Sequence, residues 1–125
     1  MRSVIAVYVE NKYGVLTRVS GLFMRRGFNI DSLTVGETDD PKFSRITITL
    51  NGDDYAREQL INQLKKLHNI KQVKLLESGS SVERELMLIK VANTAETRSE
   101  IMAAVEIYRA KIIDYTTAAL CIEVT

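Results

Sequence analysis

The sequence predicts an α+β fold in which a ferredoxin-like βαββαβ unit is followed by a second, incomplete βαββ ferredoxin-like unit. Two observations predict it. Apolar, β-branched runs alternate with stretches of helical apolar spacing along residues 3–76. The same order of elements then begins again after the polar segment ESGSS. Right-handed crossovers and short connections fold βαββαβ into one antiparallel sheet with both helices on one face.

The first two elements are a strand and an amphipathic helix. Residues 3–9 are apolar and β-branched on both faces, which predicts a buried strand. Since the helices cover only one face of the sheet, we expect a partner or the second half of the chain to cover the other face of this strand. The helix begins at Val15 and ends at Gly27, a residue type that commonly follows a helix. Its apolar stripe consists of Val15, Leu16, Val19, Leu22 and Phe23.

Three further strands and a second helix complete the first unit. Residues 29–36, 43–50 and 70–76 are the predicted strands, and ETDDP forms the loop between the first two of them. The segment NGDD at 51–54 supplies a turn and the N-cap of the second helix. The side chains expected in the core are Ile46, Ile48 and Leu50 from the middle strand and Leu60, Ile61, Leu64 and Leu67 from the helix.

The second half of the chain repeats part of this order. Residues 85–92, 111–115 and 118–124 are predicted strands, and Thr94 is a candidate cap for a helix that follows the first of them. The apolar residues expected on that helix are Ile101, Met102, Val105 and Tyr108.

These elements set the expected domain boundaries. We expect a first domain at 1–77, a linker at 78–82 and a second domain at 83–125. A full second copy would need one more helix and one more strand, so the second domain is expected to be truncated. Its first strand would then present an open edge, and bare edges are avoided or occupied. We therefore expect residues 83–125 to be held by a partner protomer or to be poorly ordered.

Composition excludes several classes of protein. A net charge of +1 over 125 residues gives no electrostatic footprint for nucleic acid or for an anionic membrane. The single cysteine, Cys121, cannot form an internal disulfide and suits a reducing compartment. No apolar run approaches the length of about 20 residues that a membrane helix needs, and no signal peptide is recognisable. We expect a cytoplasmic protein.

Catalytic interpretations find little support. The only histidine, His68, is expected to be solvated near the end of the second helix, and Cys121 lies in a strand with no histidine to activate it. There is no cluster of zinc ligands and no phosphate-binding loop. The paired aspartates at 39–40 and 53–54 fit a loop tip and a helix N-terminus. An RNA-recognition module is excluded because its stacking platform would be reduced to Phe43.

The turn ENKYG at residues 10–14 is the most informative segment. It leads directly into the first helix, whose free N–H groups near Gly14, Val15 and Leu16 form a small anion site. Gly14 lets another group approach the backbone, and Asn11 offers a carbonyl oxygen and an amide. These groups suit the carboxylate and the ammonium of an amino acid. A purely structural role in forming the turn explains the same two residues equally well.

A family resemblance favours the ligand-binding interpretation. The stretch from Asn11 to Val19, NKYGVLTRV, together with RRGFNIDSLTVG and TDDP followed by SR, resembles the N-terminal ACT domain of the small, regulatory subunit of acetolactate synthase (acetohydroxyacid synthase). VERELMLIKV and IIDYT are similar to the start of that family's C-terminal domain. The similarity covers essentially the whole chain. Tyr13 departs from it as a bulky residue in the turn, and the family's C-terminal domain continues further.

The resemblance implies a non-catalytic subunit with an ACT effector-binding domain at 1–77. Such a subunit binds and activates a thiamine-diphosphate-dependent catalytic (large) subunit and confers feedback inhibition by valine in branched-chain amino acid biosynthesis. It needs no cofactor or metal itself, since thiamine diphosphate, Mg and FAD belong to the catalytic partner. ACT domains of this family form a homodimer with the effector at its interface. The implied effector-binding residues are Asn11, Gly14, Val15, Leu16 and Thr17 of one protomer and Asn29 and Ile30 of its neighbour.

The resemblance therefore favours a regulatory subunit that senses valine. The alternative is a free-standing ACT-type amino-acid sensor that acts on another partner. A third hypothesis is a subunit that binds its enzyme without sensing any effector.

Overall fold

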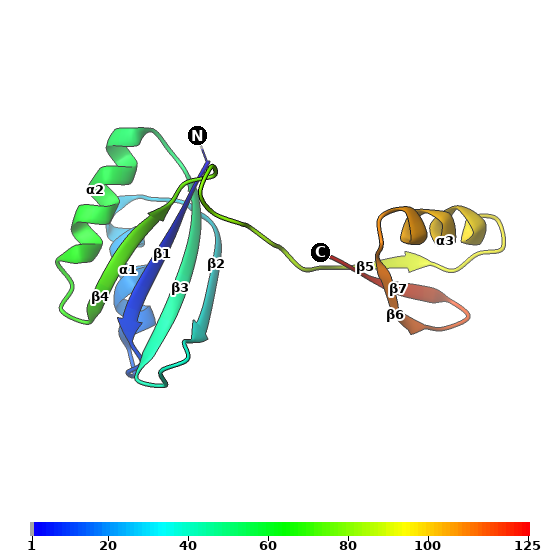
Figure 1. Ribbon diagram of the computed structural model, residues 1–125, viewed down its shortest axis with the longest axis horizontal. Coiled ribbons are helices and arrows are strands. Elements are labelled where there is room, and N and C mark those ends of the chain that lie inside the picture. The colour runs from blue at the N-terminus through cyan, green and yellow to red at the C-terminus, as the bar shows by residue number, and fades with distance from the viewer. Residues whose placement is uncertain (1) are drawn as a thin grey trace. The chain divides into compact units, whose positions relative to one another are not determined.

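A computed structural model describes residues 2–125, and the chain divides into two compact units, 1–81 and 82–125 (Figure 1). The first unit has the predicted order βαββαβ. Its elements are β1 (Arg2–Glu10), α1 (Val15–Arg26), β2 (Ile30–Glu37), β3 (Phe43–Asn51), α2 (Asp54–Lys65) and β4 (Ile70–Leu76).

The four strands form one antiparallel sheet in the order β2-β3-β1-β4, which is the ferredoxin-like arrangement (Figure 1). Both helices pack on the same face of this sheet. The pairing of β1 with β3 sets Glu10 opposite Phe43, so the turn after β1 begins beside the β2–β3 hairpin. That register positions the candidate site described below.

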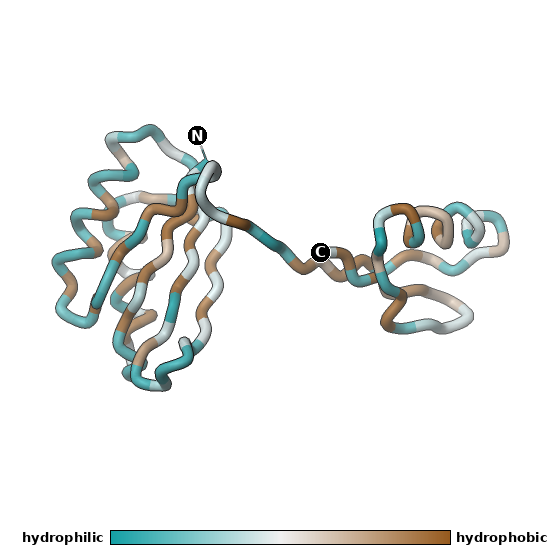
Figure 2. Tube along the Cα trace, viewed as in Figure 1, coloured by the Kyte–Doolittle hydropathy of each residue, from teal (hydrophilic) through white to brown (hydrophobic). Residues whose placement is uncertain are grey.

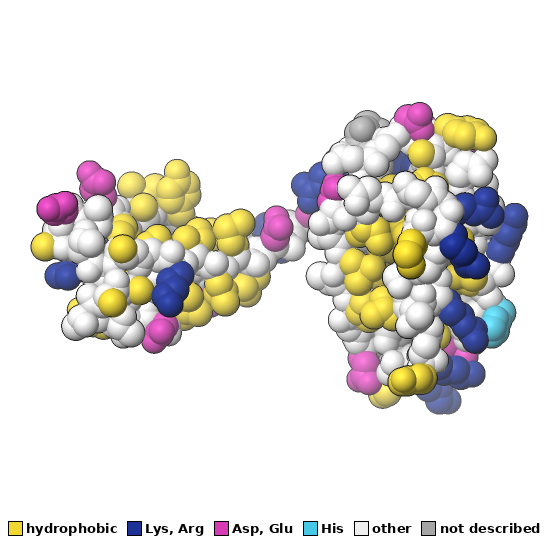
Figure 3. Space-filling model, turned by 180° about the vertical axis from the view of Figure 1, so that it is seen from behind, with side chains coloured by type: hydrophobic (Ala, Val, Ile, Leu, Met, Phe, Trp, Pro, Cys, Tyr) yellow, Lys and Arg dark blue, Asp and Glu magenta, His cyan; other side chains and the backbone are white. Residues whose placement is uncertain are grey.

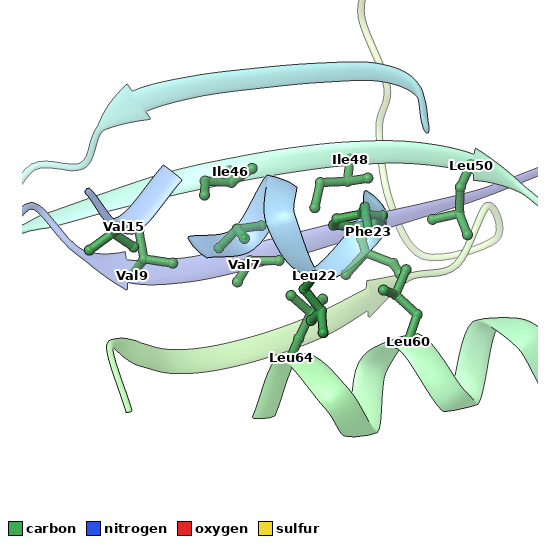
Figure 4. Packing of buried hydrophobic residues seen from close by; sticks show 12 residues of the cluster. Val7, Val9, Val15, Leu22, Phe23, Ile46, Ile48, Leu50, Leu60 and Leu64 are labelled. Carbon is green, nitrogen blue, oxygen red and sulfur yellow. The ribbon is translucent and has the colours of Figure 1, made fainter. Parts of the chain in front are cut away.

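The core lies between the sheet and the two helices. Alternate residues of β1 and β3 point toward the helices because side chains alternate across a strand. Figure 4 shows them meeting Leu22 and Phe23 of α1 and Leu60 and Leu64 of α2. The twelve residues of this buried cluster are Ile5, Val7, Val9, Val15, Val19, Leu22, Phe23, Ile46, Ile48, Leu50, Leu60 and Leu64.

The apolar stripe predicted for α1 is wrong at one position. Leu16 is 45% exposed, whereas the other four residues of the predicted stripe are buried. Val15 faces the sheet, and Leu16, which points about 100° further around the helix, faces solvent. The predicted helix ends are confirmed. Gly27 adopts a left-handed conformation with φ 71°, and Asp53 caps α2 by accepting a hydrogen bond from the Ala56 N–H at 2.8 Å.

The opposite face of the sheet is partly covered by its own side chains. Ala6 of β1 is fully buried between β3 and β4. The Arg45 guanidinium lies 5.9 Å from the centre of the Tyr8 ring, and Lys71 Nζ lies 4.1 Å from the centre of the Phe43 ring. These cation–π contacts supply, within the unit, some of the cover that the sequence predicted this face to need.

The second unit has the predicted incomplete βαββ order. Its strands form an antiparallel sheet in the order β5-β7-β6. Thr94, the candidate cap, accepts a hydrogen bond from the Thr97 N–H at 3.2 Å, and the N-cap itself is Thr97. The elements are β5 (Met87–Ala92), α3 (Arg98–Ile107), β6 (Lys111–Tyr115) and β7 (Ala119–Val124). Among residues 2–125, no helix is long and apolar enough to cross a membrane.

The second unit buries little of its apolar surface. Leu120 and Ile122 of β7 are its buried hydrophobic residues, and α3 buries none. Figure 2 colours β5 and β7 largely brown, and Figure 3 shows yellow hydrophobic side chains over much of this unit. Between α3 and the sheet lies an entirely apolar groove of about 320 Å³. Few buried apolar contacts lower the free energy of local opening.

This difference in burial predicts different rates of amide hydrogen exchange. Amides of β1 and β3, whose side chains form the core, should exchange much more slowly than those of β5 and β7 at neutral pH. Mass spectrometry of peptides from each unit, in dilute protein, measures this directly. Equal, slow exchange in both units would contradict the expected difference in stability.

Candidate functional site

The N-terminus of α1 is left open by its sequence. Gly14 occupies the N-cap position with φ 87° and ψ −6°, and no side chain caps this end within the described residues. The first turn contains no acidic residue. The Val15 N–H donates to the Lys12 carbonyl at 3.4 Å. The N–H groups of Leu16 and Thr17 have no acceptor inside the helix, so they are available to an anion or to water.

Open space lies in front of this turn. A Cβ built on Gly14 would meet no atom within 4 Å. Leu16 is half exposed beside it, and Tyr13 is fully exposed. The bulky Tyr13 side chain therefore points into solvent and does not close the turn. A small ligand could approach the free N–H groups with an apolar side chain beside Leu16.

Asn11 fastens the turn to the β2–β3 hairpin. Its backbone N–H donates to the Lys42 carbonyl at 2.8 Å. Its side-chain Nδ2 donates to the Pro41 carbonyl at 2.9 Å and to Glu37 Oε1 at 3.1 Å. Both neighbours of the side-chain amide are acceptors, which fixes its orientation, because a flip would set Oδ1 against two oxygens. Within residues 2–125, nothing donates to Asn11 Oδ1.

Charged side chains of both signs surround the turn. Lys12 Nζ lies 2.7 Å from Glu10 Oε2. The hydrogen bond from Lys12 lowers the pKa of the Glu10 carboxyl; burial opposes this change, and the charges of Lys12 and His68 add to it. Arg18, in the second turn of α1, donates to Asn69 Oδ1 and lies 3.4 Å from His68 Nε2. Since Glu10 pairs with Lys12, the cation of α1 nearest this end that forms no salt bridge within the described residues is Arg18.

The structure brings together five of the residues implied by the resemblance and sets two apart. Asn11, Gly14, Val15, Leu16 and Thr17 surround the turn, although Val15 is buried in the core. Ile30 pairs with Leu50, which also pairs with Ser3 at the start of β1. Asn29 and Ile30 therefore lie at the opposite end of β2 from the turn, and within one chain they cannot join the site. Their contribution from a neighbouring protomer stays a prediction.

Sequence reasoning missed the part played by the hairpin. Glu37 and Pro41 were assigned only to a loop, yet both accept hydrogen bonds from Asn11. The available signal was the predicted ferredoxin-like plan, in which the first and third strands are antiparallel neighbours, so that the end of one lies beside the start of the other. The interpretation of the paired aspartates is confirmed, since Asp40 Oδ1 accepts from the Lys42 N–H at 3.0 Å and Asp53 caps α2. No group of metal-ligating side chains occurs in residues 2–125.

Comparisons with known proteins identify the family. The model of the AHAS small subunit-like ACT domain matches residues 5–72, and that of the small subunit of acetolactate synthase matches residues 84–125. The chain belongs to the family of acetolactate synthase small subunits. The resemblance found in the sequence is thereby confirmed, and residues 5–72 are an ACT domain.

Relatives within this family match nearly the whole chain. A probable acetolactate synthase small subunit of Archaeoglobus fulgidus is 54% identical, over 100% of this chain and 78% of the relative. The acetolactate synthase isozyme 3 small subunit of Escherichia coli is 45% identical, over 98% of this chain and 76% of the relative. The crystal structure of the acetolactate synthase small subunit from Thermotoga maritima is 41% identical, with a TM-score of 0.90, over 99% of this chain and 78% of that one.

The left-handed conformation of Gly14 has a measurable consequence for this family member. Gly14→Ala should lower the free energy of unfolding by about 1–2 kcal/mol, because a Cβ disfavours this backbone region. Gly21→Ala is the matched control. Gly21 lies within α1, its added Cβ would also meet open space, and alanine there should stabilise by roughly 0.5–1 kcal/mol. Urea denaturation measures both, and equal effects of the two substitutions would contradict the geometry at Gly14.

Proposed function

We propose that this chain is the regulatory subunit of an acetolactate synthase: it binds and activates the catalytic subunit and makes it sensitive to feedback inhibition by valine. Membership of the small-subunit family and the ACT domain support a regulatory role. Thiamine diphosphate, Mg and FAD would be held by the catalytic partner. The small subunit would contribute no catalytic residue.

The observation that carries this proposal is the open first turn of α1. The N–H groups of Leu16 and Thr17 can bind a carboxylate at the positive end of the helix dipole. Asn11 Oδ1, which has no donor within the described residues, can accept from an ammonium. The half-exposed side chain of Leu16 offers an apolar contact. Together these groups match a small apolar amino acid such as valine.

The rest of the effector site would come from a second copy of the ACT domain. β2 is an edge strand whose side chains are largely exposed, and Val35 on it is 46% exposed. An exposed edge of this kind can pair with another strand. In a homodimer formed side by side, Asn29 and Ile30 of the neighbour would close the site. Valine would then bridge two protomers, which would couple its binding to dimerisation.

The direct test is to mix the chain with an acetolactate synthase catalytic subunit and to assay activity with and without valine. Activation that valine reverses would support the proposal. Activation without any effect of valine would leave a subunit that binds its enzyme but senses nothing. Binding of valine without any activation would favour the free-standing sensor.

Two substitutions should separate sensing from activation. Gly14→Asp places a carboxylate where the carboxylate of valine would bind, so like charges repel. Asn11→Ala removes the oxygen for the ammonium together with the two side-chain bonds that hold the turn to the hairpin, at a cost of about 1–3 kcal/mol in valine binding. Both variants should still activate the catalytic subunit and should lose inhibition by valine.

The control for Gly14→Asp is Gly14→Ala, which introduces the same backbone strain without the charge. It should retain more of the inhibition by valine than Gly14→Asp does. If Gly14→Asp or Asn11→Ala abolished activation together with inhibition, the turn would be structural and the assignment of the effector site would be wrong.

A further inference from the structure

In both units, an asparagine holds the turn between the first strand and the first helix by the same kinds of hydrogen bond. Asn93 follows β5 directly, as Asn11 follows β1. The Asn93 N–H donates to the Ala118 carbonyl at 2.9 Å, and its Nδ2 donates to the Thr116 carbonyl at 2.9 Å. Ala118 immediately precedes β7, as Lys42 immediately precedes β3. In each unit, one asparagine therefore ties the strand-to-helix turn to the hairpin through its backbone and its side-chain amide.

The units differ in which group donates to the side-chain oxygen, Oδ1, of that asparagine. Asn93 Oδ1 accepts a hydrogen bond from Arg98 Nε at 2.8 Å. Arg98 is the first residue of α3, where the helix dipole disfavours a positive charge, so this bond offsets an unfavourable position. The second unit thus places its own cation on the asparagine oxygen. In the first unit the first helical residue is the buried Val15, and no donor within residues 2–125 reaches Asn11 Oδ1.

The first unit also has a carboxylate at the asparagine that the second unit lacks. β2 ends in Glu37, whose Oε1 accepts from Asn11 Nδ2 at 3.1 Å. β6 ends in Tyr115 at the corresponding place. Glu37 is exposed and forms no salt bridge within the described residues, and Lys12 of the turn is paired with Glu10. A negative charge is therefore held against the amide whose oxygen is open to a ligand.

We propose that Glu37 makes the turn at Gly14 selective for a ligand that carries an ammonium beside its carboxylate. It acts as a positioning residue through Asn11: it fixes the amide so that Oδ1 is presented outward, and its charge favours a cationic donor at that oxygen. In the second unit Arg98 occupies the place that the ligand's ammonium would take in the first unit, so the second unit has no open oxygen for a ligand. The proposal rests on the proposed function, which assigns this turn to the effector.

The test compares two ligands that differ in the charge of one donor. L-Valine carries an ammonium on its α-carbon, and 2-hydroxy-3-methylbutanoate carries a neutral hydroxyl there. Calorimetric titration of the 125-residue chain measures the affinity of each ligand for wild type and for Glu37→Gln. The glutamine oxygen can still accept from Asn11 Nδ2, so the substitution removes the charge and preserves the hydrogen bond. Asp39→Asn is the matched control, because it removes an exposed carboxylate from the same hairpin.

We expect Glu37→Gln to lower the affinity for valine about 3–10-fold at low salt. The affinity for the hydroxy acid should not change, because only the ammonium interacts with the charge of Glu37. The loss should shrink at high ionic strength. Asp39→Asn should change neither affinity by more than about 2-fold, because it does not contact Asn11. An equal loss of affinity for both ligands in Glu37→Gln would show that the role of Glu37 is structural and would overturn the inference. An unchanged affinity for valine would overturn it as well.

Two further outcomes are distinguishable from these. If the hydroxy acid binds too weakly to measure, a loss of valine affinity in Glu37→Gln that salt abolishes and that Asp39→Asn does not reproduce supports the inference, and any other pattern overturns it. If wild type binds neither ligand while it activates the catalytic subunit, the proposed effector site itself is wrong, and the role of Glu37 falls with it.

Discussion

The geometry of the candidate site depends on the bonds that tie Asn11 to the β2–β3 hairpin. The pairing of β1 with β3 brings the end of one strand beside the start of the other. Asn11 then closes that junction with one backbone and two side-chain hydrogen bonds. Because the turn is fixed at this point, α1 starts at a defined place with its N–H groups open. The same bonds decide which atom of the Asn11 amide remains for a ligand.

In the second unit, a side chain of the protein itself binds the asparagine oxygen that is open in the first unit. Asn93 repeats the backbone and amide bonds, and Arg98 occupies the oxygen that is open in the first unit. The two units also differ in packing, since the first has a core of twelve buried residues and the second buries mainly Leu120 and Ile122. A well-packed unit with an open turn suits a sensor. A unit with a closed turn and much exposed apolar surface suits contact with another protein.

The order of elements could be predicted from the sequence, because apolar periodicity directly records which faces are buried. Gly14 and Asn11 were also recognisable, since their residue types are characteristic of turns. The exposure of Leu16 could not be predicted, because two adjacent apolar residues fit more than one orientation of a helix on a sheet. The bonds from Asn11 to Glu37 and Pro41 were not predicted either, because they join residues 26 and 30 positions apart and depend on strand register. Asn29 and Ile30 were assigned to the site by the family resemblance, as residues of a neighbouring protomer, and that assignment stays a prediction.

The central claim is that an amino acid binds at the first turn of α1 and leaves the corresponding turn of the second unit untouched. Titration of the ¹⁵N-labelled chain with valine, followed by NMR, tests it most directly, because the side-chain amides of Asn11 and Asn93 give separate signals. We expect shifts at the Leu16 and Thr17 backbone amides and at the Asn11 side chain, with none at Asn93 or Arg98. Shifts confined to the second unit, or none at saturating valine, would contradict it.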